Sequence, residues 1–124
     1  MSGNVKVAGV GMIPFGRYPE QHVAQLGAEA ALAALDDAGV EIKDMNALFC
    51  GNAWAASEMV GQKILRQIGQ TGIPVVNTAN ACASGGTALR LAVTAIKAGS
   101  REPVYVKTRI TDSMTSLQSS GLSA

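Results

Sequence analysis

Short apolar runs alternate along the chain with longer segments in which apolar residues recur at helical spacing. The apolar runs predict strands near residues 5–10, 47–50 and 73–78, because a strand covered on both faces is apolar throughout. The helical spacing predicts helices over residues 22–38, 58–68 and about 85–99. Because strands and helices alternate, we expect an α/β fold: a mostly parallel sheet with right-handed crossovers and helices packed on it, in which residues 73–78 form the central strand.

The residues at the helix ends support this division. Gly39 and Gly69 are well placed to end the first two helices, because glycine readily adopts the left-handed conformation that closes a helix. Ser57 can cap the helix that starts at Glu58. No good N-cap residue precedes His22, the sole histidine, and we expect His22 to be exposed or to cap the first helix.

The third helix is apolar around almost its whole circumference. Only Arg90, Thr94 and Lys97 are polar in its body. A helix of this kind requires burial on more than one side. We therefore expect it to lie between two layers of structure.

Composition narrows the class of protein. The chain has 124 residues, 48% hydrophobic and 15% charged, with a formal net charge of +1. These values predict one modest core and give no case for nucleic acid or a membrane surface as a partner. No apolar run has the length of a membrane span. The start of the chain lacks the pattern of a signal peptide. Both cysteines are expected to be free thiols, as is usual in the reducing cytoplasm. Cytoplasm is therefore the expected location.

Two glycines in the first apolar run raise the alternative of a dinucleotide-binding loop. Gly9 and Gly11 have part of the required spacing. No third glycine completes it before a helix, and Pro14, Phe15 and Gly16 intervene. The sequence therefore does not favour this alternative.

Cys82 is the candidate reactive residue. It lies between the strand near residues 73–78 and the alanine-rich helix, with Gly85 and Gly86 just after it. A helix N-terminus favours a thiolate, and its N–H groups can stabilise the oxyanion of a thioester under attack. The glycines leave room for an acyl group. The alternative is that Cys82 is a small buried hydrophobic residue, as we expect for Cys50.

Residues 73–99 resemble the nucleophile segment of the thiolase superfamily, within it the sterol-carrier-type thiolases often called lipid-transfer proteins. The residues that carry the resemblance are Asn77, Asn80, Cys82, Ser84, Gly85 and Thr87-Ala88-Leu89. The opening stretch, residues 7–16, also resembles the first strand and turn of that family. The resemblance covers about residues 4–99.

The resemblance implies a function and a set of partners. Cys82 would hold an acyl group as a thioester in an acyl-CoA C-acyltransferase, which cleaves a 3-oxoacyl-CoA with coenzyme A or condenses two acyl-CoAs. The coenzyme A thioester would be substrate, with no separate cofactor and no metal, and no residue is assigned to its binding. A homo-oligomer such as a dimer, or a thiolase-like partner chain, is expected. Trp54 would lie at the subunit interface or active-site rim, or serve in packing.

The sequence departs from the family after Gly99. We expect two regions: a partial thiolase N-terminal domain over 1–99, and a divergent strand with a serine-rich tail over 100–124. The second region alternates apolar with polar residues, the apolar ones being Val104, Val106 and Ile110. This alternation predicts a strand with one face exposed to solvent. The family's second half contributes a histidine in a Gly-His-Pro motif and a cysteine in a Cys-x-Gly motif, and neither motif occurs here. We therefore expect an incomplete, truncated thiolase-like half that is inactive in isolation.

Three alternatives stay open at this point. The lipid-transfer label of the subgroup implies lipid or acyl-CoA carriage, although no segment resembles the separate sterol-carrier domain. The apolar third helix and an open sheet edge favour a non-catalytic subunit that docks on a complete thiolase-like partner. A ketoacyl synthase, which shares the fold and a similar cysteine turn, is a weaker enzyme alternative.

Overall fold

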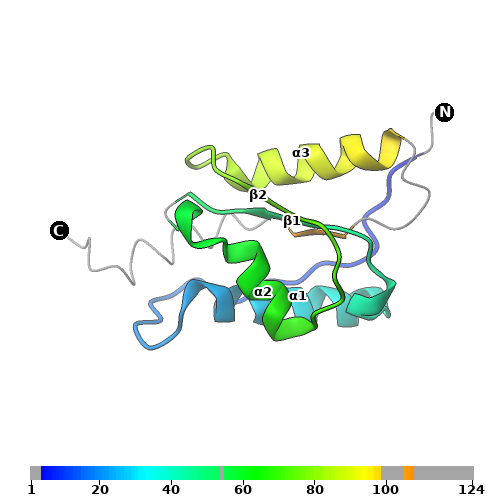
Figure 1. Ribbon diagram of the computed structural model, residues 1–124. Coiled ribbons are helices and arrows are strands. Elements are labelled where there is room, and N and C mark those ends of the chain that lie inside the picture. Colours follow the sequence, from blue (N-terminus) through cyan, green and yellow to red (C-terminus); the bar gives the residue numbers. More distant parts are fainter. Residues whose placement is uncertain (1–3, 54, 99–104, 108–124) are drawn as a thin grey trace.

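The computed structural model describes residues 4–53, 55–98 and 105–107. Its helices and strands are α1 (Val23–Ala38), β1 (Leu48–Gly51), α2 (Val60–Ile68), β2 (Val75–Thr78), α3 (Ser84–Lys97) and β3 (Tyr105–Lys107), with 3-10 turns η1 (Ile42–Asp44) and η2 (Ala56–Glu58). The elements form three layers, with α3 on one face of a small sheet and α1 and α2 on the other (Figure 1). This arrangement confirms the α/β prediction.

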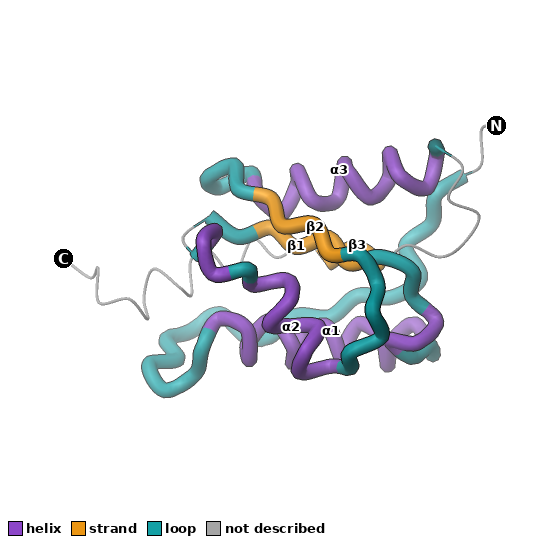
Figure 2. The backbone as a smooth tube through the Cα atoms, viewed as in Figure 1, coloured by secondary structure: helices purple, strands orange, loops and turns teal. Residues whose placement is uncertain are grey.

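The described strands form a parallel sheet in the order β2-β1-β3 (Figure 2). The chain moves from β1 to β2 through α2 and from β2 past β1 to β3 through α3. The two crossovers move along the sheet in opposite directions, and their helices cover opposite faces. This is the result expected when both crossovers have the same handedness. The central position predicted for residues 73–78 is wrong within this sheet: β1 is central and β2 lies at an edge.

Side chains of β1 alternate between the two faces of the sheet. Cys50 packs in a cluster from α1, α2 and the segment after β1, whose other buried members are Val23, Ala24, Ala31, Ala55, Val60 and Ile64. Phe49 packs on the opposite face against Ala88 and Ala92 of α3. A strand apolar at every position is therefore covered by helices on both sides, which explains the continuous apolar run in the sequence.

The strand predicted over residues 5–10 is absent from the described sheet. Instead this segment runs against α1: a Cβ on Gly9 would lie 2.6 Å from the backbone nitrogen of Ala38. The backbone N–H of Val10 donates to the Asp37 carboxylate at 2.8 Å, rather than to a neighbouring strand. Val10 is 69% exposed, so the prediction of burial on both faces is also wrong.

Most predicted helix ends agree with the structure. Gly39 ends α1 with φ of 69°, and the Gly69 N–H closes α2 on the Leu65 carbonyl. His22 caps α1 through Nδ1, which accepts from the N–H of Ala24 at 3.4 Å.

The predicted start of the second helix is wrong. Ser57 lies inside the short turn η2 rather than at a helix cap. Met59 then takes a left-handed backbone conformation, with φ of 51°, which interrupts helical geometry. The α-helix therefore begins only at Val60.

The helix α3 is buried on one side in the described part of the chain. Its buried residues are Ser84, Gly85, Ala88 and Ala92, whereas Leu89 is 43% exposed and Leu91 40% exposed. The second covering layer that the sequence predicts for this helix is thus not found among these residues.

Two other predictions fall wholly or partly on residues outside the described ranges. Trp54 and the serine-rich tail lie outside them. A strand is found in the divergent region, as β3, and it pairs with β1 in parallel.

Asn77 joins β2 to α2, and its removal should loosen this contact. Its Oδ1 accepts from the N–H of Gly61 at 2.8 Å, and its Nδ2 donates to Gln62 Oε1 at 2.6 Å. We expect Asn77→Ala to lower the free energy of unfolding by about 1–2 kcal/mol, because the partly buried Gly61 N–H loses its acceptor. Urea denaturation measures this loss, and Gln67→Ala, an exposed amide on α2, is the control. An unchanged urea midpoint for Asn77→Ala would contradict the prediction.

Candidate functional site

Cys82 lies in the turn that connects the end of β2 to the start of α3. Its side chain belongs to an exposed residue, whereas Cys50 is buried, and both are free thiols. The structure therefore places Cys82 at the strand-to-helix junction that the sequence predicts. Its chemical role stays a prediction at this point.

The turn around Cys82 is tight. The N–H of Ala83 donates to the Asn80 carbonyl at 2.9 Å, and the N–H of Ser84 donates to the Ala81 carbonyl at 3.2 Å. Ala81 has a φ of 47°, a left-handed conformation that costs a residue with a Cβ about 1 kcal/mol or more. Surrounding interactions must hold this conformation in place.

The Ser84 hydroxyl supplies two of those interactions. It accepts from the N–H of Asn80 at 2.8 Å and donates to the Ala81 carbonyl at 2.7 Å. Ser84 is 3% exposed, so these hydrogen bonds are partly buried. One hydroxyl on the first residue of α3 thus binds the two residues before Cys82.

Two threonines complete the network. Thr87 Oγ1 accepts from Asn80 Nδ2 at 3.1 Å and donates to the Ala83 carbonyl at 2.9 Å. Thr78 Oγ1, at the end of β2, donates to the Ser84 carbonyl at 3.1 Å. The turn is consequently held from both the helix and the strand that it connects.

Gly51 brings the end of β1 into contact with the start of α3. A Cβ at this position would overlap the carbonyl group of Ser84 and lie 2.7 Å from the N–H nitrogen of Gly85. Sequence reasoning singled out Gly85 and Gly86 but missed Gly51, whose only signal is that it ends an apolar run. Of the two named glycines, Gly85 is buried, whereas Gly86 has open space around it.

The N-terminal end of α3 can stabilise negative charge. In the part of the chain that the structure describes, the N–H groups of Gly85 and Gly86 have no backbone acceptor. Free N–H groups in the first turn of a helix attract anions and can bind an oxyanion. This observation agrees with the chemistry expected of a thiol in the preceding turn.

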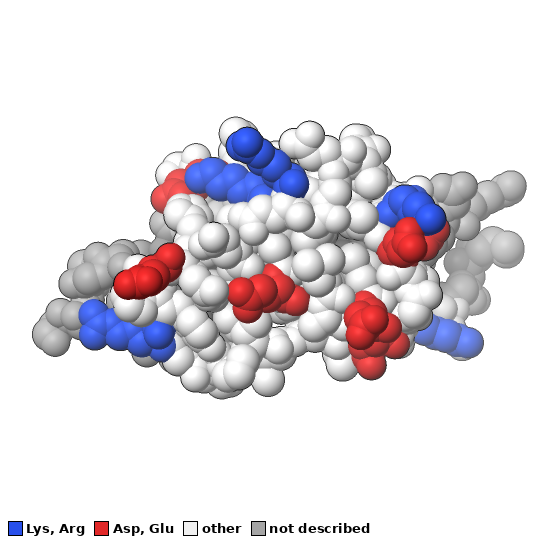
Figure 3. Space-filling model, turned by 90° about the horizontal axis from the view of Figure 1, so that it is seen from below, with Lys and Arg blue, Asp and Glu red and all other residues white. Residues whose placement is uncertain are grey.

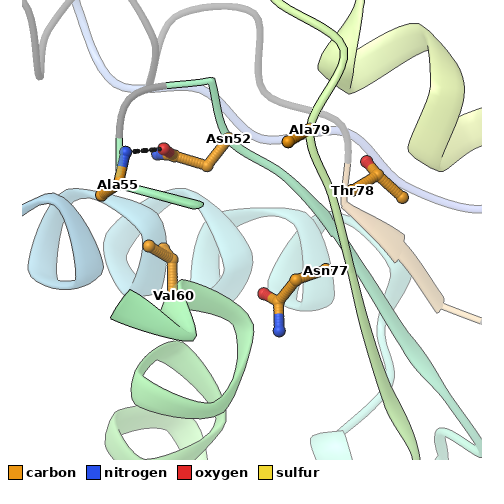
Figure 4. Close-up of a pocket in the computed structure, with 6 residues that line it drawn as sticks. All are labelled: Asn52, Ala55, Val60, Asn77, Thr78 and Ala79. Carbon is orange, nitrogen blue, oxygen red and sulfur yellow. Dashed lines mark hydrogen bonds between the residues drawn. The ribbon is translucent and has the colours of Figure 1, made fainter. Parts of the chain in front are cut away.

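A small pocket lies at the ends of β1 and β2. It has a volume of about 50 Å³ and is lined by Asn52, Ala55, Val60, Asn77, Thr78 and Ala79 (Figure 4). Asn52 follows β1 and holds the loop by accepting from the N–H of Ala55 at 2.6 Å. Ligands commonly bind at the carboxyl ends of parallel strands. Cys82 is not among the lining residues of this pocket.

The comparison with protein families decides the class of the chain. Residues 5–116 match the family model described as "Thiolase, N-terminal domain". The chain belongs to the thiolase family. The matched segment includes the whole β2–Cys82–α3 unit, and it extends beyond Gly99, where the sequence suggested a boundary. The division into regions 1–99 and 100–124 stays a prediction.

Relatives of this thiolase domain include proteins named as acetyltransferases and proteins named as lipid-transfer or sterol carrier proteins. The acetyl-CoA acetyltransferase of Methanothermobacter thermautotrophicus is 37% identical over 100 residues, which are 77% of this chain and 26% of that protein. The non-specific lipid-transfer protein-like 2 of Caenorhabditis elegans is 35% identical over 103 residues, 81% of this chain and 25% of that protein. Sterol carrier protein 2 of Gallus gallus is 35% identical over 101 residues, 80% of this chain and 18% of that protein. This thiolase domain thus spans about a quarter or less of the length of these relatives.

The other candidate residues of the thiolase domain lie apart from the Cys82 turn. The partners of His22 are Ala24, Gln25, Leu26 and Glu58, whose carboxylate is 3.4 Å from Nε2. None of them belongs to the turn. Cys50 is 3% exposed and packs in the core, which confirms the structural role predicted for it.

Charge on the thiolase domain is dispersed. On the face formed by α1 and α2, acidic and basic side chains lie in small separate groups (Figure 3). Among the described residues, no group of three or more His, Cys, Asp or Glu side chains is placed to hold a metal ion. No described helix combines the length and apolar character that crossing a membrane requires.

Proposed function

We propose that this domain supplies the nucleophile of a thiolase-type acyl-CoA C-acyltransferase, and that Cys82 is that nucleophile. The observation that carries the proposal is the exposed thiol in the turn before α3, in a chain that belongs to the thiolase family. Relatives named acetyl-CoA acetyltransferase support an acyl-CoA as substrate.

The proposed step is a thioester exchange. The Cys82 thiolate attacks the carbonyl carbon of an acyl-CoA, a new C–S bond forms, and the bond from carbon to the coenzyme A sulfur breaks. Coenzyme A leaves as its thiolate and the acyl group stays on Cys82. The N–H groups of Gly85 and Gly86 are the proposed donors to the oxyanion of the intermediate.

Complete turnover requires groups that this sequence lacks. The first acyl transfer requires only the thiolate of Cys82, and we expect the domain alone to perform it. Repeated turnover also requires a base and an acid, yet the sole histidine is engaged at the start of α1. We propose that a thiolase-like partner chain or the rest of a longer thiolase supplies them. A second copy of the domain in a homo-oligomer, and a cytoplasmic location, stay part of the same proposal.

Acyl transfer to Cys82 tests the proposal directly. The 124-residue protein is incubated with acetyl-CoA, digested under acidic, non-reducing conditions and analysed by peptide mass spectrometry. We expect a hydroxylamine-sensitive acetyl group on Cys82 and none on Cys50. We also expect iodoacetamide to label exposed Cys82 faster than buried Cys50 in the folded chain.

A matched pair of variants controls this experiment. Cys82→Ser should abolish acetylation, and Cys50→Ala should leave it in place. The proposal fails if the folded protein takes no acetyl group, or if iodoacetamide labels Cys82 and Cys50 equally or labels neither.

Lipid or acyl-CoA carriage is the second candidate, favoured by the relatives named as lipid-transfer and sterol carrier proteins. Titration with a fluorescent acyl-CoA separates the two functions. A carrier would bind the probe equally well with Cys82→Ser and leave its thioester bond intact. An acyltransferase would release coenzyme A, and only when the thiol is present.

A further inference from the structure

The hydroxyl of Ser84 forms a bridge around Cys82. Its hydrogen bonds, 2.8 Å to Asn80 N and 2.7 Å to the Ala81 carbonyl, connect the first residue of α3 to the two residues that precede the thiol. Cys82 and Ala83 are the only residues between these attachment points. The bridge therefore restricts the backbone of Cys82 itself.

The Ser84 hydroxyl has no hydrogen left to donate to the reacting sulfur. Its single hydrogen is donated to the Ala81 carbonyl, and one of its two lone pairs accepts from the N–H of Asn80. Ser84 is 3% exposed, so substrate does not reach it in this arrangement. Any influence of Ser84 on Cys82 is consequently exerted through the turn.

The turn needs such a bridge. Ala81 is in the left-handed region at φ of 47°, where an alanine is disfavoured relative to extended or helical backbone. Without the bond to its carbonyl, Ala81 can relax to a favoured conformation, which changes the backbone that positions Cys82. Thr87 adds a weaker bond, 3.1 Å to the exposed side chain of Asn80.

We propose that Ser84 is a positioning residue for Cys82: its buried hydroxyl holds the turn so that the thiol stays at the N-terminal end of α3, and Thr87 assists through Asn80. The inference rests on the proposed function of Cys82 as a nucleophile. It adds a residue that contacts neither substrate nor sulfur but determines the electrostatic environment of the sulfur.

The test measures the local field at the thiol rather than stability. Cys82 is alkylated with neutral iodoacetamide and with anionic iodoacetate, and each rate is divided by that of N-acetylcysteinamide in the same buffer. A helix N-terminus attracts the anionic reagent, so the ratio of the two normalised rates reports how close Cys82 lies to that end. The variants are Ser84→Ala, Ser84→Thr and Thr87→Ala, each made in the full chain.

Thr94→Ala is the matched control. The Thr94 hydroxyl of α3 also donates to a backbone carbonyl, that of Arg90, at 2.9 Å, but it lies away from the turn. We expect Ser84→Ala to lower the iodoacetate-to-iodoacetamide ratio by about two- to fivefold, the range expected for the field of a helix end. Ser84→Thr should restore the ratio, Thr87→Ala should lower it less, and Thr94→Ala should leave it unchanged. Labelling of buried Cys50 reports unfolding in every variant.

A ratio for folded Ser84→Ala equal to that of the wild type overturns the inference. Labelling of Cys50 as fast as that of Cys82 would show that Ser84→Ala has unfolded. In that case Thr87→Ala replaces it as the test. An unchanged iodoacetate-to-iodoacetamide ratio in Thr87→Ala then overturns the inference. Acetylation by acetyl-CoA keeps the two proposals apart. An unacetylated wild type contradicts the proposed function, whereas equal acetylation and equal ratios in wild type and Ser84→Ala contradict only the role of Ser84.

Discussion

Replacing Gly51 with alanine should destabilise the domain by about 3 kcal/mol and separate the start of α3 from the sheet. The added Cβ would overlap the Ser84 carbonyl group and lie 2.7 Å from the nitrogen of Gly85. These neighbours are backbone atoms, which cannot rotate away as the end of a long side chain can. Either β1 or the first turn of α3 must shift, and the Cys82 turn is attached to that first turn through Ser84.

Gly86→Ala is the matched control for Gly51→Ala. A Cβ on Gly86 meets no atom within 4 Å, and alanine is favoured over glycine in a helix by up to about 1 kcal/mol. We therefore expect the two substitutions to change the urea midpoint in opposite directions. Urea denaturation followed by circular dichroism measures both. A Gly51→Ala protein as stable as the wild type would show that α3 is not seated on β1 as described.

The layer order of the fold follows from the sequence because it depends on local pattern. The apolar run around Phe49 and Cys50 lies between two helical segments, and such a run is buried on both faces wherever it pairs. Helix α1 was predicted almost to the residue, since glycine at position 39 has few alternatives to a left-handed cap.

Strand pairing could not be predicted in the same way. The run at residues 5–10 is as rich in β-branched residues as a buried strand, yet Gly9 fits closely against the backbone of α1 and the Val10 N–H is bonded to Asp37. A pattern along one segment does not specify which element accepts its backbone hydrogen bonds. The position of β2 at the edge of the described sheet was missed for the same reason.

The same distinction, between features set by consecutive residues and contacts between distant segments, applies to the candidate site. The location of Cys82 before a helix could be predicted, because strand, turn and helix are consecutive in the sequence. The role of Gly51 could not, because its contact with Ser84 joins residues far apart in the chain. The Ser84 bridge depends on the left-handed backbone of Ala81, and alanine gives no signal for that conformation.

Ile64→Ala should cause the other large loss of stability, about 2–5 kcal/mol, because it leaves a cavity where α2 meets the sheet. Ile64 is 0% exposed and belongs to the same cluster as Cys50 and Val60. The cavity weakens packing around Cys50, so iodoacetamide should label that thiol faster as well. Leu32→Ala removes a side chain that is 50% exposed on α1 and should cost less than 1 kcal/mol.

The pattern of labelling distinguishes a loosened core from a disturbed site. If Ile64 supports the core beneath β1, Ile64→Ala should accelerate labelling of Cys50 while the iodoacetate-to-iodoacetamide ratio at Cys82 stays near that of the wild type. Ser84→Ala should give the reverse, because Ser84 begins α3, and α3 covers the face of the sheet opposite to α1 and α2 (Figure 1). Equal urea midpoints for Ile64→Ala and Leu32→Ala would contradict the burial of Ile64. A change in both thiols with either variant would mean that the two faces of this sheet are not independent.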